Sequence, residues 1–155
     1  MLTDGRIIYD SEGRQIKYFY VQDGLGVRLL KAVGIKTIFI TAKPSRTIEY
    51  RARDMMVEKV YEGIHPKTRV LGEILEAHAI KEEEICYVGD DLVDLGMMKI
   101  VGFPVAVANA CREIKDSARY ITLKSGGSGA VREVAELILQ TQGKWGEAVD
   151  LEIGS

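Results

Sequence analysis

The sequence predicts an α/β domain in which a mostly parallel sheet carries helices on both faces, accompanied by a β-hairpin. Two observations predict this class. Short β-branched apolar runs alternate along the chain with segments of helical periodicity, and 46% of the 155 residues are hydrophobic, which is enough for one core. No repeat, low-complexity segment or linker divides the sequence. We therefore expect residues 1–155 to form a single domain.

The predicted strands are separated by intervals long enough for a helix. They are Thr37–Ile40, Ile85–Val88, Val105–Ala108 and Tyr120–Leu123. All but the last lead directly into a helical pattern, so we place them in a parallel sheet. Residues 6–21 differ, because Asp10-Ser-Glu-Gly13 precedes the alternating Ile16, Tyr18 and Tyr20. This pattern predicts a β-hairpin with a glycine-containing turn.

The predicted helices carry apolar residues on one stripe and have recognisable end signals. They cover about residues 23–33, 46–56, 66–78, 92–101 and 130–139. Gly34 ends the first helix and Pro66 opens the third. Residues after Gln142 become polar, and we expect a loose tail from about residue 143.

Charge and composition exclude several partners. The chain has 21 Lys and Arg against 23 Asp and Glu, and no basic run marks a nucleic-acid footprint. No apolar stretch approaches the ~20 residues of a membrane span, and no signal-peptide pattern opens the sequence. Cys86 and Cys111 lack metal-ligand spacing and are expected to be reduced thiols. We therefore expect a cytoplasmic protein that binds neither nucleic acid nor membranes.

Polar residues gather directly after the predicted strands. Thr41 follows the first strand, and Asp90 and Asp91 follow the second. Lys67 lies where a loop enters the third helix. In open α/β sheets, ligands bind outside the carboxyl ends of the strands. A hydroxyl, an ammonium and clustered carboxylates are the groups that phosphoryl transfer requires, since its protein catalysis is mainly positioning and charge neutralisation.

The aspartates are spaced for one hard cation. Asp90 and Asp94 lie one helical turn apart with Asp91 between them, so two or three carboxylates can converge. Mg²⁺ is expected, because it takes oxygen ligands and needs only one or two protein carboxylates beside a substrate phosphate. The structural alternative is that Asp91 only caps the helix that follows, and both interpretations stay open.

Other candidates are weaker by themselves. Lys67 alone could be a solvated charge in a first helical turn, and His65 could contact a substrate or simply be exposed. Residues 63–68 resemble a nucleotide phosphate loop only superficially, because the second glycine before the Lys-Thr pair is missing. The glycines near residues 24 and 126–129 could present amides to an anion, but they are also typical of turns.

Four motifs, taken together, resemble the haloacid dehalogenase superfamily. They are Leu2-Thr-Asp-Gly5, Ile40-Thr-Ala-Lys43, Lys67 and Gly89-Asp-Asp-Leu-Val-Asp94. Further segments are similar to the 3-deoxy-D-manno-octulosonate 8-phosphate phosphatases within that superfamily. These are Ile16–Phe19, Val21–Gly26, Val105–Asn109 and Gly126–Glu133. The resemblance runs from Leu2 to about Lys144.

The resemblance implies a three-layer, Rossmann-like fold of the haloacid dehalogenase type without a large cap domain. It implies a cytoplasmic homotetramer of lipopolysaccharide biosynthesis, which hydrolyses a sugar-acid phosphate with Mg²⁺ through an aspartyl-phosphate. The implied site residues are Asp90 for the metal, Thr41, Lys67, Asp91 and Asp94 for catalysis, and Lys43, Asp23, Gly24 and His65 for substrate binding.

Three departures from the family pattern bear on function. The family places a strand ending in Asp-x-Asp-Gly-Val before its Leu-Thr-Asp-Gly motif, and Met1 stands where that valine would be. We therefore expect the nucleophile and the acid/base aspartate to be absent from the sequence as given, since Asp4 belongs to the later motif. Ala42-Lys43 and Gln22 replace the usual Gly-Arg and Arg. A lysine lacks the bidentate fork that suits a carboxylate, so recognition of the sugar acid is expected to be weakened or altered.

Two hypotheses account for these departures. Either the start was assigned too late and the protein is an active phosphatase, or the chain is a non-catalytic oligomeric or sugar-phosphate-binding protein. In both, the absent strand would be central, and Thr37–Ile40 and Ile85–Val88 would keep unpaired backbone groups along an apolar slot. We expect such a chain to be poorly stable or repaired by another segment. A receiver-like domain fits least, because it places a phosphoacceptor after a middle strand and a lysine after the last strand, and neither Thr41 nor Leu123-Lys124 fits these positions. The exact sugar phosphate stays open, with nonulosonate phosphates as alternatives.

Overall fold

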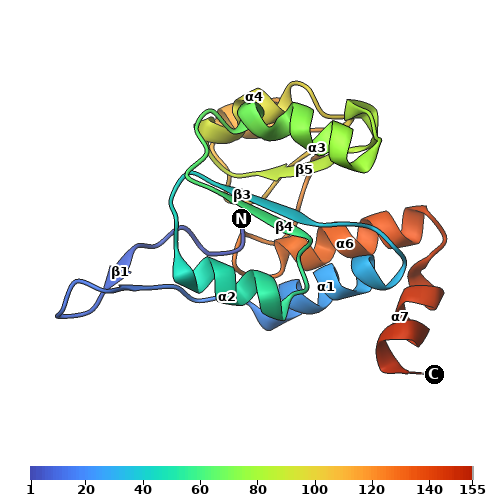
Figure 1. The fold of residues 1–155 in the computed structure, drawn as a ribbon, viewed down its shortest axis with the longest axis horizontal. Helices are drawn as coiled ribbons and strands as arrows, with labels where there is room; N and C mark the ends of the chain where they lie inside the picture. Colours follow the sequence, from blue (N-terminus) through green and yellow to red (C-terminus); the bar gives the residue numbers. More distant parts are fainter. Residues whose placement is uncertain (155) are drawn as a thin grey trace.

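The protein has three layers, with strands between two groups of helices (Figure 1). The structure is a computed structural model that describes residues 1–154. The strands are β3 (Ile38–Thr41), β4 (Lys59–Glu62), β5 (Cys86–Gly89), β6 (Phe103–Ala106) and β7 (Tyr120–Ile121). One group of helices contains α1 (Val21–Ala32), α2 (Arg46–Asp54) and α6 (Ala130–Thr141). The other contains α3 (Leu71–His78), α4 (Leu95–Met98) and α5 (Arg112–Asp116). The predicted α/β class is confirmed.

The parallel strands form two sheets rather than one. β3 pairs with β4, and a second sheet has the order β5-β6-β7. The apolar runs do not predict β4, because Lys59-Val-Tyr-Glu62 is only half apolar and lies at an edge. The other strands begin or end within two residues of the predicted positions.

An apolar slot separates the two sheets. β3 and β5 do not pair with each other, and both line a cavity of about 780 Å³. All four residues of β3 are only half-buried, although the strand reads Ile-Phe-Ile-Thr. Protein interiors seldom contain voids larger than a water molecule. The slot predicted between these two strands is therefore present in the structure.

The buried apolar residues form three hydrophobic clusters. Met97, Met98, Val107 and Ile114 are almost fully buried around β5 and β6. On the opposite face, α1 packs against α6 through a second cluster that includes Leu29, Leu30, Ala135 and Leu139. A third cluster of Tyr61, Val70 and Ile74 lies against the β3–β4 sheet, and Ile40 of β3 packs against both this cluster and the first one.

The prediction of a loose tail after residue 143 is wrong. Helix α7 (Trp145–Ile153) packs against α1 and α6, and Ala148 is fully buried between them. Arg28 and Glu152 form an ion pair at 2.5 Å. Acidic residues alternate with the apolar residues of this segment, so the apolar face of the helix is difficult to recognise in the sequence.

The predicted hairpin is present but shorter than residues 6–21. β1 (Ile8–Tyr9) and β2 (Gln15–Ile16) pair in the antiparallel direction. The Asp10 carboxylate accepts from the amides of Glu12 and Arg14, both at 2.9 Å, and closes the turn. Figure 1 shows the hairpin extending away from the body of the fold.

Two predicted helices begin as 3₁₀ turns. η1 (Lys67–Val70) precedes α3, and η3 (Leu92–Asp94) precedes the short α4, where we expected one helix over residues 92–101. A third 3₁₀ turn, η2 (Glu82–Glu84), leads into β5. None of the helices within residues 1–154 combines the length and apolar character needed to cross a membrane.

Candidate active site

The carboxyl ends of three strands meet at one edge of the fold. Figure 1 shows the chain leaving β3, β4 and β5 on the same side. Thr41 is the last residue of β3, Asp90 follows β5, and Lys67 opens η1 after β4. The amide of Ile64 donates to the carbonyl of Thr41 at 3.1 Å, which ties the loop before Lys67 to the end of β3. The groups predicted from the sequence therefore belong to a shared edge.

A buried ion pair forms the centre of this edge. Lys67 Nζ donates to Asp94 Oδ1 at 2.5 Å, and the two residues are 8% and 0% exposed. Asp94 also accepts from the Tyr87 hydroxyl at 2.6 Å and from the amides of Asp90 and Asp91 at 3.0 and 3.3 Å. Four donors thus occupy the two oxygens of Asp94. Its carboxylate positions Lys67 and the turn that carries Asp90.

The surroundings of Asp94 favour its ionised form. Burial raises the pKa of Asp94, but the charge of Lys67 and the hydrogen bonds from Lys67 and Tyr87 outweigh it, so this pKa lies below its usual range. Burial and the neighbouring Asp94 carboxylate raise the pKa of Tyr87. The phenol therefore keeps its proton and donates it to Asp94.

Acid is expected to destabilise the protein through Asp94. Because the pKa of Asp94 is lower in the folded state than in the unfolded state, its stabilising contribution is complete above the unfolded value of about 3.9. That contribution disappears as the pH falls through the lower folded value, where the folded state also takes up the proton. Urea unfolding from neutral pH to about pH 2 measures this loss. The free energy of unfolding should fall less steeply with decreasing pH for Lys67→Met than for the parent chain. An unchanged pH dependence would show that the Lys67–Asp94 pair is not its cause.

Tyr87 is a site residue that the sequence patterns missed. It lies in β5, two residues before Gly89, and its ring and hydroxyl are buried beneath the turn that carries the aspartates. The available signal was a tyrosine inside an apolar run, because a buried phenol requires a hydrogen-bond partner. Its hydroxyl supplies one of the two side-chain donors to Asp94.

The substitution Tyr87→Phe is expected to lower the free energy of unfolding by about 1.5–3 kcal/mol, the usual value of a hydrogen bond to a charged group. Tyr61→Phe is the matched control, because Tyr61 donates to the exposed Glu73 at 2.8 Å. We expect the control to lose less, since water can replace its bond. Urea unfolding compares the two variants. Equal losses would show that the Asp94 bond is no stronger than a surface bond.

Asp90 is the carboxylate that fits a divalent cation. It is partly exposed at the end of β5, and its Oδ2 already accepts from a cationic group, the α-ammonium of Met1, at 2.6 Å. Asp91 accepts from the amide of Leu92 at 2.8 Å and caps η3. Its contacts are therefore those of the predicted helix cap. Residues 1–154 contain no cluster of three or more His, Cys, Asp or Glu side chains arranged for a metal. A single partly exposed carboxylate fits Mg²⁺, whose other ligands are commonly water and phosphate.

Thr41 at the end of β3 and the loop residues Lys43 and His65 also belong to this edge. The Thr41 hydroxyl donates to the carbonyl of Lys43 at 3.1 Å and accepts from its amide at 3.2 Å, which closes the turn after β3. Lys43 and His65 are exposed, and neither forms an ion pair within the described part of the chain. Their substrate-binding roles stay predictions.

Asp23 and Gly24 are engaged in helix packing. Asp23 is 1% exposed, and its Oδ1 accepts from the amide of Arg132 at 2.9 Å, in the first turn of α6. Burial raises the pKa of Asp23, against the opposing effects of the α6 amides and of Arg51. A Cβ added at Gly24 would come within 2.6 Å of the Arg51 guanidinium. These contacts give both residues a structural role, while their predicted role in substrate binding stays untested.

A glycine-rich loop closes the edge against the segment that begins at Met1. The amide of Gly126 donates to Asn109 Oδ1 at 2.8 Å, and the amide of Gly127 donates to the Met1 carbonyl at 2.9 Å. Gly127 has a φ of +69°, and a Cβ there would come within 2.4 Å of the Asp4 amide nitrogen. A side chain at this position would therefore displace the segment that begins at Met1, whose α-ammonium contacts Asp90.

Comparisons with known proteins place this arrangement in a class. A model of the haloacid dehalogenase-like hydrolases matches residues 42–134. The chain is 39% identical to the 3-deoxy-D-manno-octulosonate 8-phosphate phosphatase KdsC of Escherichia coli (strain K12) over 148 aligned residues. This alignment covers 96% of this chain and 79% of that relative. Fold and site together define a haloacid dehalogenase-like hydrolase.

Solved structures narrow the class further. The 3-deoxy-D-manno-octulosonate 8-phosphate phosphatase from Moraxella catarrhalis, in complex with magnesium, phosphate and KDO, matches with a TM-score of 0.92 and 40% identity, over 96% of this chain and 86% of that one. The cobalt-bound form of the phosphatase from Haemophilus influenzae matches with a TM-score of 0.88 and 33% identity, over 93% and 84%. The chain therefore belongs to the 3-deoxy-D-manno-octulosonate 8-phosphate phosphatase family of haloacid dehalogenase-like hydrolases, which confirms the resemblance of its motifs and the predicted fold type.

Proposed function

We propose that this protein is a Mg²⁺-dependent phosphomonoesterase that hydrolyses 3-deoxy-D-manno-octulosonate 8-phosphate or a similar sugar-acid phosphate. The observation that carries the proposal is the buried Lys67–Asp94 pair, at the edge shared with Asp90 and Thr41. The magnesium, phosphate and KDO bound by the Moraxella catarrhalis relative support the same ligand classes here.

The residues at this edge have distinct tasks in the proposal. Lys67 neutralises charge on the phosphoryl group, and its ammonium is held by Asp94 before substrate arrives, so no reorganisation is needed. The Thr41 hydroxyl can turn from the Lys43 carbonyl to a phosphoryl oxygen as a hydrogen-bond donor. Lys43 supplies a point charge for the carboxylate of the sugar acid, without the bidentate geometry of an arginine.

Asp90 would hold the metal. When bound, Mg²⁺ neutralises the phosphate and orients it for displacement. Asp94 contributes indirectly, because it accepts from the amide of Asp90 at 3.0 Å and so fixes the turn that presents the ligand. Asp91 stiffens the same turn by capping η3.

The proposal assigns the nucleophile to none of the aspartates at this edge. Asp94 accepts hydrogen bonds from four donors, and Asp91 caps a helical turn. Asp90 is the proposed metal ligand. We propose that the nucleophile comes from the Asp-x-Asp strand that precedes the Leu-Thr-Asp-Gly motif in the family pattern.

The test compares this chain with an extended chain, in which the strand-forming residues that precede the matching segment of the Escherichia coli relative are placed before Met1. The extended chain is expected to release phosphate from 3-deoxy-D-manno-octulosonate 8-phosphate only when Mg²⁺ is present. An extended chain that folds and binds Mg²⁺ but releases no phosphate would overturn the proposal.

Within the extended chain, Asp90→Asn is expected to reduce kcat/KM by about 10²–10³-fold, the typical effect of removing one element of transition-state charge stabilisation. Asp116→Asn is the control, because Asp116 is an exposed carboxylate on α5. A Mg²⁺ titration of phosphate release distinguishes the two variants. If both variants keep the Mg²⁺ dependence of the parent, Asp90 is not the ligand.

We further propose that the protein is a cytoplasmic homotetramer of lipopolysaccharide biosynthesis. The hairpin carries the exposed apolar residues Ile7, Tyr9, Ile16 and Tyr18, a surface suited to association. Cys86 and Cys111 are free thiols, which suits a reducing compartment. Sedimentation equilibrium would measure the mass of the assembly, and a monomer at micromolar concentration would contradict the proposal.

A further inference from the structure

We propose that Glu62 is a positioning residue for recognition of the sugar acid, because its carboxylate holds the loop that carries Lys43. This loop, residues 42–45, connects β3 to α2 and is called the Lys43 loop below. The inference rests on the proposed function, which assigns Lys43 to the carboxylate of the sugar acid. It names the residue that keeps Lys43 in place for that task.

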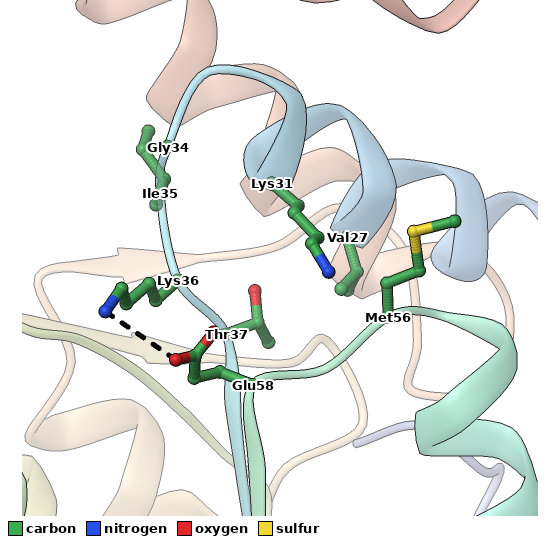
Figure 2. Close-up of a pocket in the computed structure, with 8 residues that line it drawn as sticks. All are labelled: Val27, Lys31, Gly34, Ile35, Lys36, Thr37, Met56 and Glu58. Atoms are coloured by element: carbon green, nitrogen blue, oxygen red, sulfur yellow. Dashed lines mark ion pairs between the residues drawn. The ribbon is translucent and has the colours of Figure 1, made fainter.

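Two glutamates flank β4 and have different partners. At the amino ends of the strands, the carboxylate of Glu58 pairs with Lys36 at 3.6 Å, beside a cavity of about 190 Å³ (Figure 2). Glu62 is the last residue of β4 and is half-buried. Within residues 1–154 it has no cation partner, and its Oε1 accepts from the backbone amide of Ser45 at 3.0 Å. The carboxylate of Glu62 therefore restrains the backbone of the Lys43 loop rather than balancing a charge.

Glu62 lies directly beside Thr41 in the β3–β4 sheet. The two residues are register partners at the carboxyl ends of their strands. Side chains alternate between the two faces of a sheet, so those of register partners project to the same face. Thr41 Oγ1 contacts the carbonyl and the amide of Lys43 at 3.1 and 3.2 Å, and Glu62 contacts the amide of Ser45. Neighbouring side chains of the sheet thus hold the Lys43 loop at two points.

Pro44 stiffens the loop between these two points. The ring of a proline restricts its backbone φ angle to a narrow range. The ring also lies beside the residue after Glu62, because a Cβ added at Gly63 would be 3.9 Å from Pro44 Cγ. Restraining the amide of Ser45 therefore also restrains Lys43, two residues earlier in the chain.

The hydrogen bond from Ser45 to Glu62 matters most when substrate is bound. In the proposed function the Thr41 hydroxyl turns from the Lys43 carbonyl to a phosphoryl oxygen, which removes one restraint on the loop. The bond between Ser45 and Glu62 involves no reacting group, so substrate binding does not require it to break. A group that is already held in place needs no reorganisation when the substrate binds. Glu62 therefore keeps Lys43 positioned while Thr41 contacts the phosphate.

The structural alternative is that Glu62 only stabilises α2, which begins directly after Ser45. A carboxylate near the amino end of a helix interacts favourably with the helix dipole. Glu49 is an exposed carboxylate in the first turn of α2 and offers the same interaction. Within the described part of the chain it forms no hydrogen bond with the Lys43 loop. Glu49→Ala is therefore the matched control for a helix effect.

Steady-state kinetics of the extended chain with Mg²⁺ and 3-deoxy-D-manno-octulosonate 8-phosphate test the proposal. Glu62→Ala is expected to raise KM by about tenfold, a factor typical of weakening one hydrogen bond to a charged group. Its kcat should change little, because the loss concerns binding of the carboxylate and not phosphoryl transfer. Glu62→Gln keeps an oxygen that can accept from the amide of Ser45, so its KM should stay close to that of the parent. Glu49→Ala should leave both constants unchanged.

Three kinetic results would overturn the proposal. They are an unchanged KM in Glu62→Ala, equal increases of KM in Glu62→Ala and Glu62→Gln, and a loss in kcat as large as the increase in KM. The last result would mean that Glu62 supports the whole edge rather than Lys43.

A double-mutant cycle tests whether Glu62 acts through Lys43. Lys43→Met removes the charge that Glu62 is proposed to position. Adding Glu62→Ala to Lys43→Met should therefore change KM by less than about twofold, although the same substitution has a larger effect in the parent. Effects on KM that multiply independently would show that Glu62 does not act through Lys43.

Amide hydrogen exchange measures the restraint on the loop without substrate. In the 155-residue chain, Glu62→Ala should make the amide of Ser45 exchange at least about tenfold faster, because local opening becomes easier. The amide of Ile64, which donates to the carbonyl of Thr41 at 3.1 Å, is the internal control and should change little. An unchanged exchange rate at Ser45 would overturn the proposal.

The kinetics also separate this inference from the proposed function. An extended chain that folds but releases no phosphate would refute the proposed function, and this inference with it. An active extended chain whose KM is insensitive to Glu62→Ala would refute this inference alone.

Discussion

Replacing Lys67 by methionine is expected to cause the largest loss of stability of any single substitution at the site. Methionine keeps most of the bulk of the stem but leaves the carboxylate of Asp94, which is 0% exposed, without its cation. Removing one partner of a buried ion pair typically costs about 3–5 kcal/mol. In the extended chain, kcat/KM should also fall by about 10²–10³-fold or more, because the phosphoryl charge is no longer neutralised. Urea unfolding and steady-state kinetics measure the two effects.

The controls for Lys67 separate charge burial from catalysis. Lys67→Met combined with Asp94→Asn removes both charges, so it should recover part of the stability without recovering activity. Lys59→Met breaks an exposed pair with Glu73 at 2.7 Å and should change the free energy of unfolding by less than about 1 kcal/mol. Equal destabilisation by Lys67→Met and Lys59→Met would refute the buried pair.

Adding the upstream strand is expected to stabilise the protein more than any substitution described above. Fully burying one Val, Leu or Ile side chain contributes about 1.5–3 kcal/mol. An apolar strand in the slot of about 780 Å³ would bury several such side chains and pair the free edges of β3 and β5. A typical domain has only about 5–15 kcal/mol of total stability. We therefore expect the 155-residue chain to unfold at low urea concentration and the extended chain to unfold at a much higher one.

Urea unfolding also checks the mechanism of this stabilisation. Filling the slot buries additional apolar surface, so the m-value should rise together with the midpoint. An extension whose apolar strand residues are replaced by serine is the matched control, and it should leave both quantities near those of the 155-residue chain. A 155-residue chain that already unfolds cooperatively with high stability as a monomer would refute this prediction.

The limits of sequence interpretation can be seen in particular elements. β5 and the turn at Asp90 are predicted well, because an apolar run followed by Gly-Asp-Asp is typical of a buried strand that ends in a capped turn. β4 and α7 are missed, because their buried faces are interrupted by charged residues such as Lys59 and Glu147 that lie on the outer surface. Local patterns detect continuous apolar runs and fail where burial depends on which partner covers a half-polar segment.

The site shows the same division between local and tertiary information. Residue types and strand ends identify Thr41, Lys67 and the aspartates, since phosphate chemistry requires such groups at that position. They do not distinguish the role of Asp90 from that of Asp94. The distinction arises from the fold, which surrounds Asp94 with Lys67, Tyr87 and two amides and leaves Asp90 partly exposed.

The sequence by itself determined the α/β class, the family and the edge at which the chemical groups gather, because these depend on local periodicity and on motifs of a few residues. Only the tertiary structure decided that Asp94 is buried and accepts from Lys67, that Asp23 packs against α6, and that residues 145–153 form a helix. It also revealed the extent of the slot between β3 and β5. The physical reason is that burial, charge pairing and unfilled volume are properties of segments far apart in the chain, which no local pattern contains.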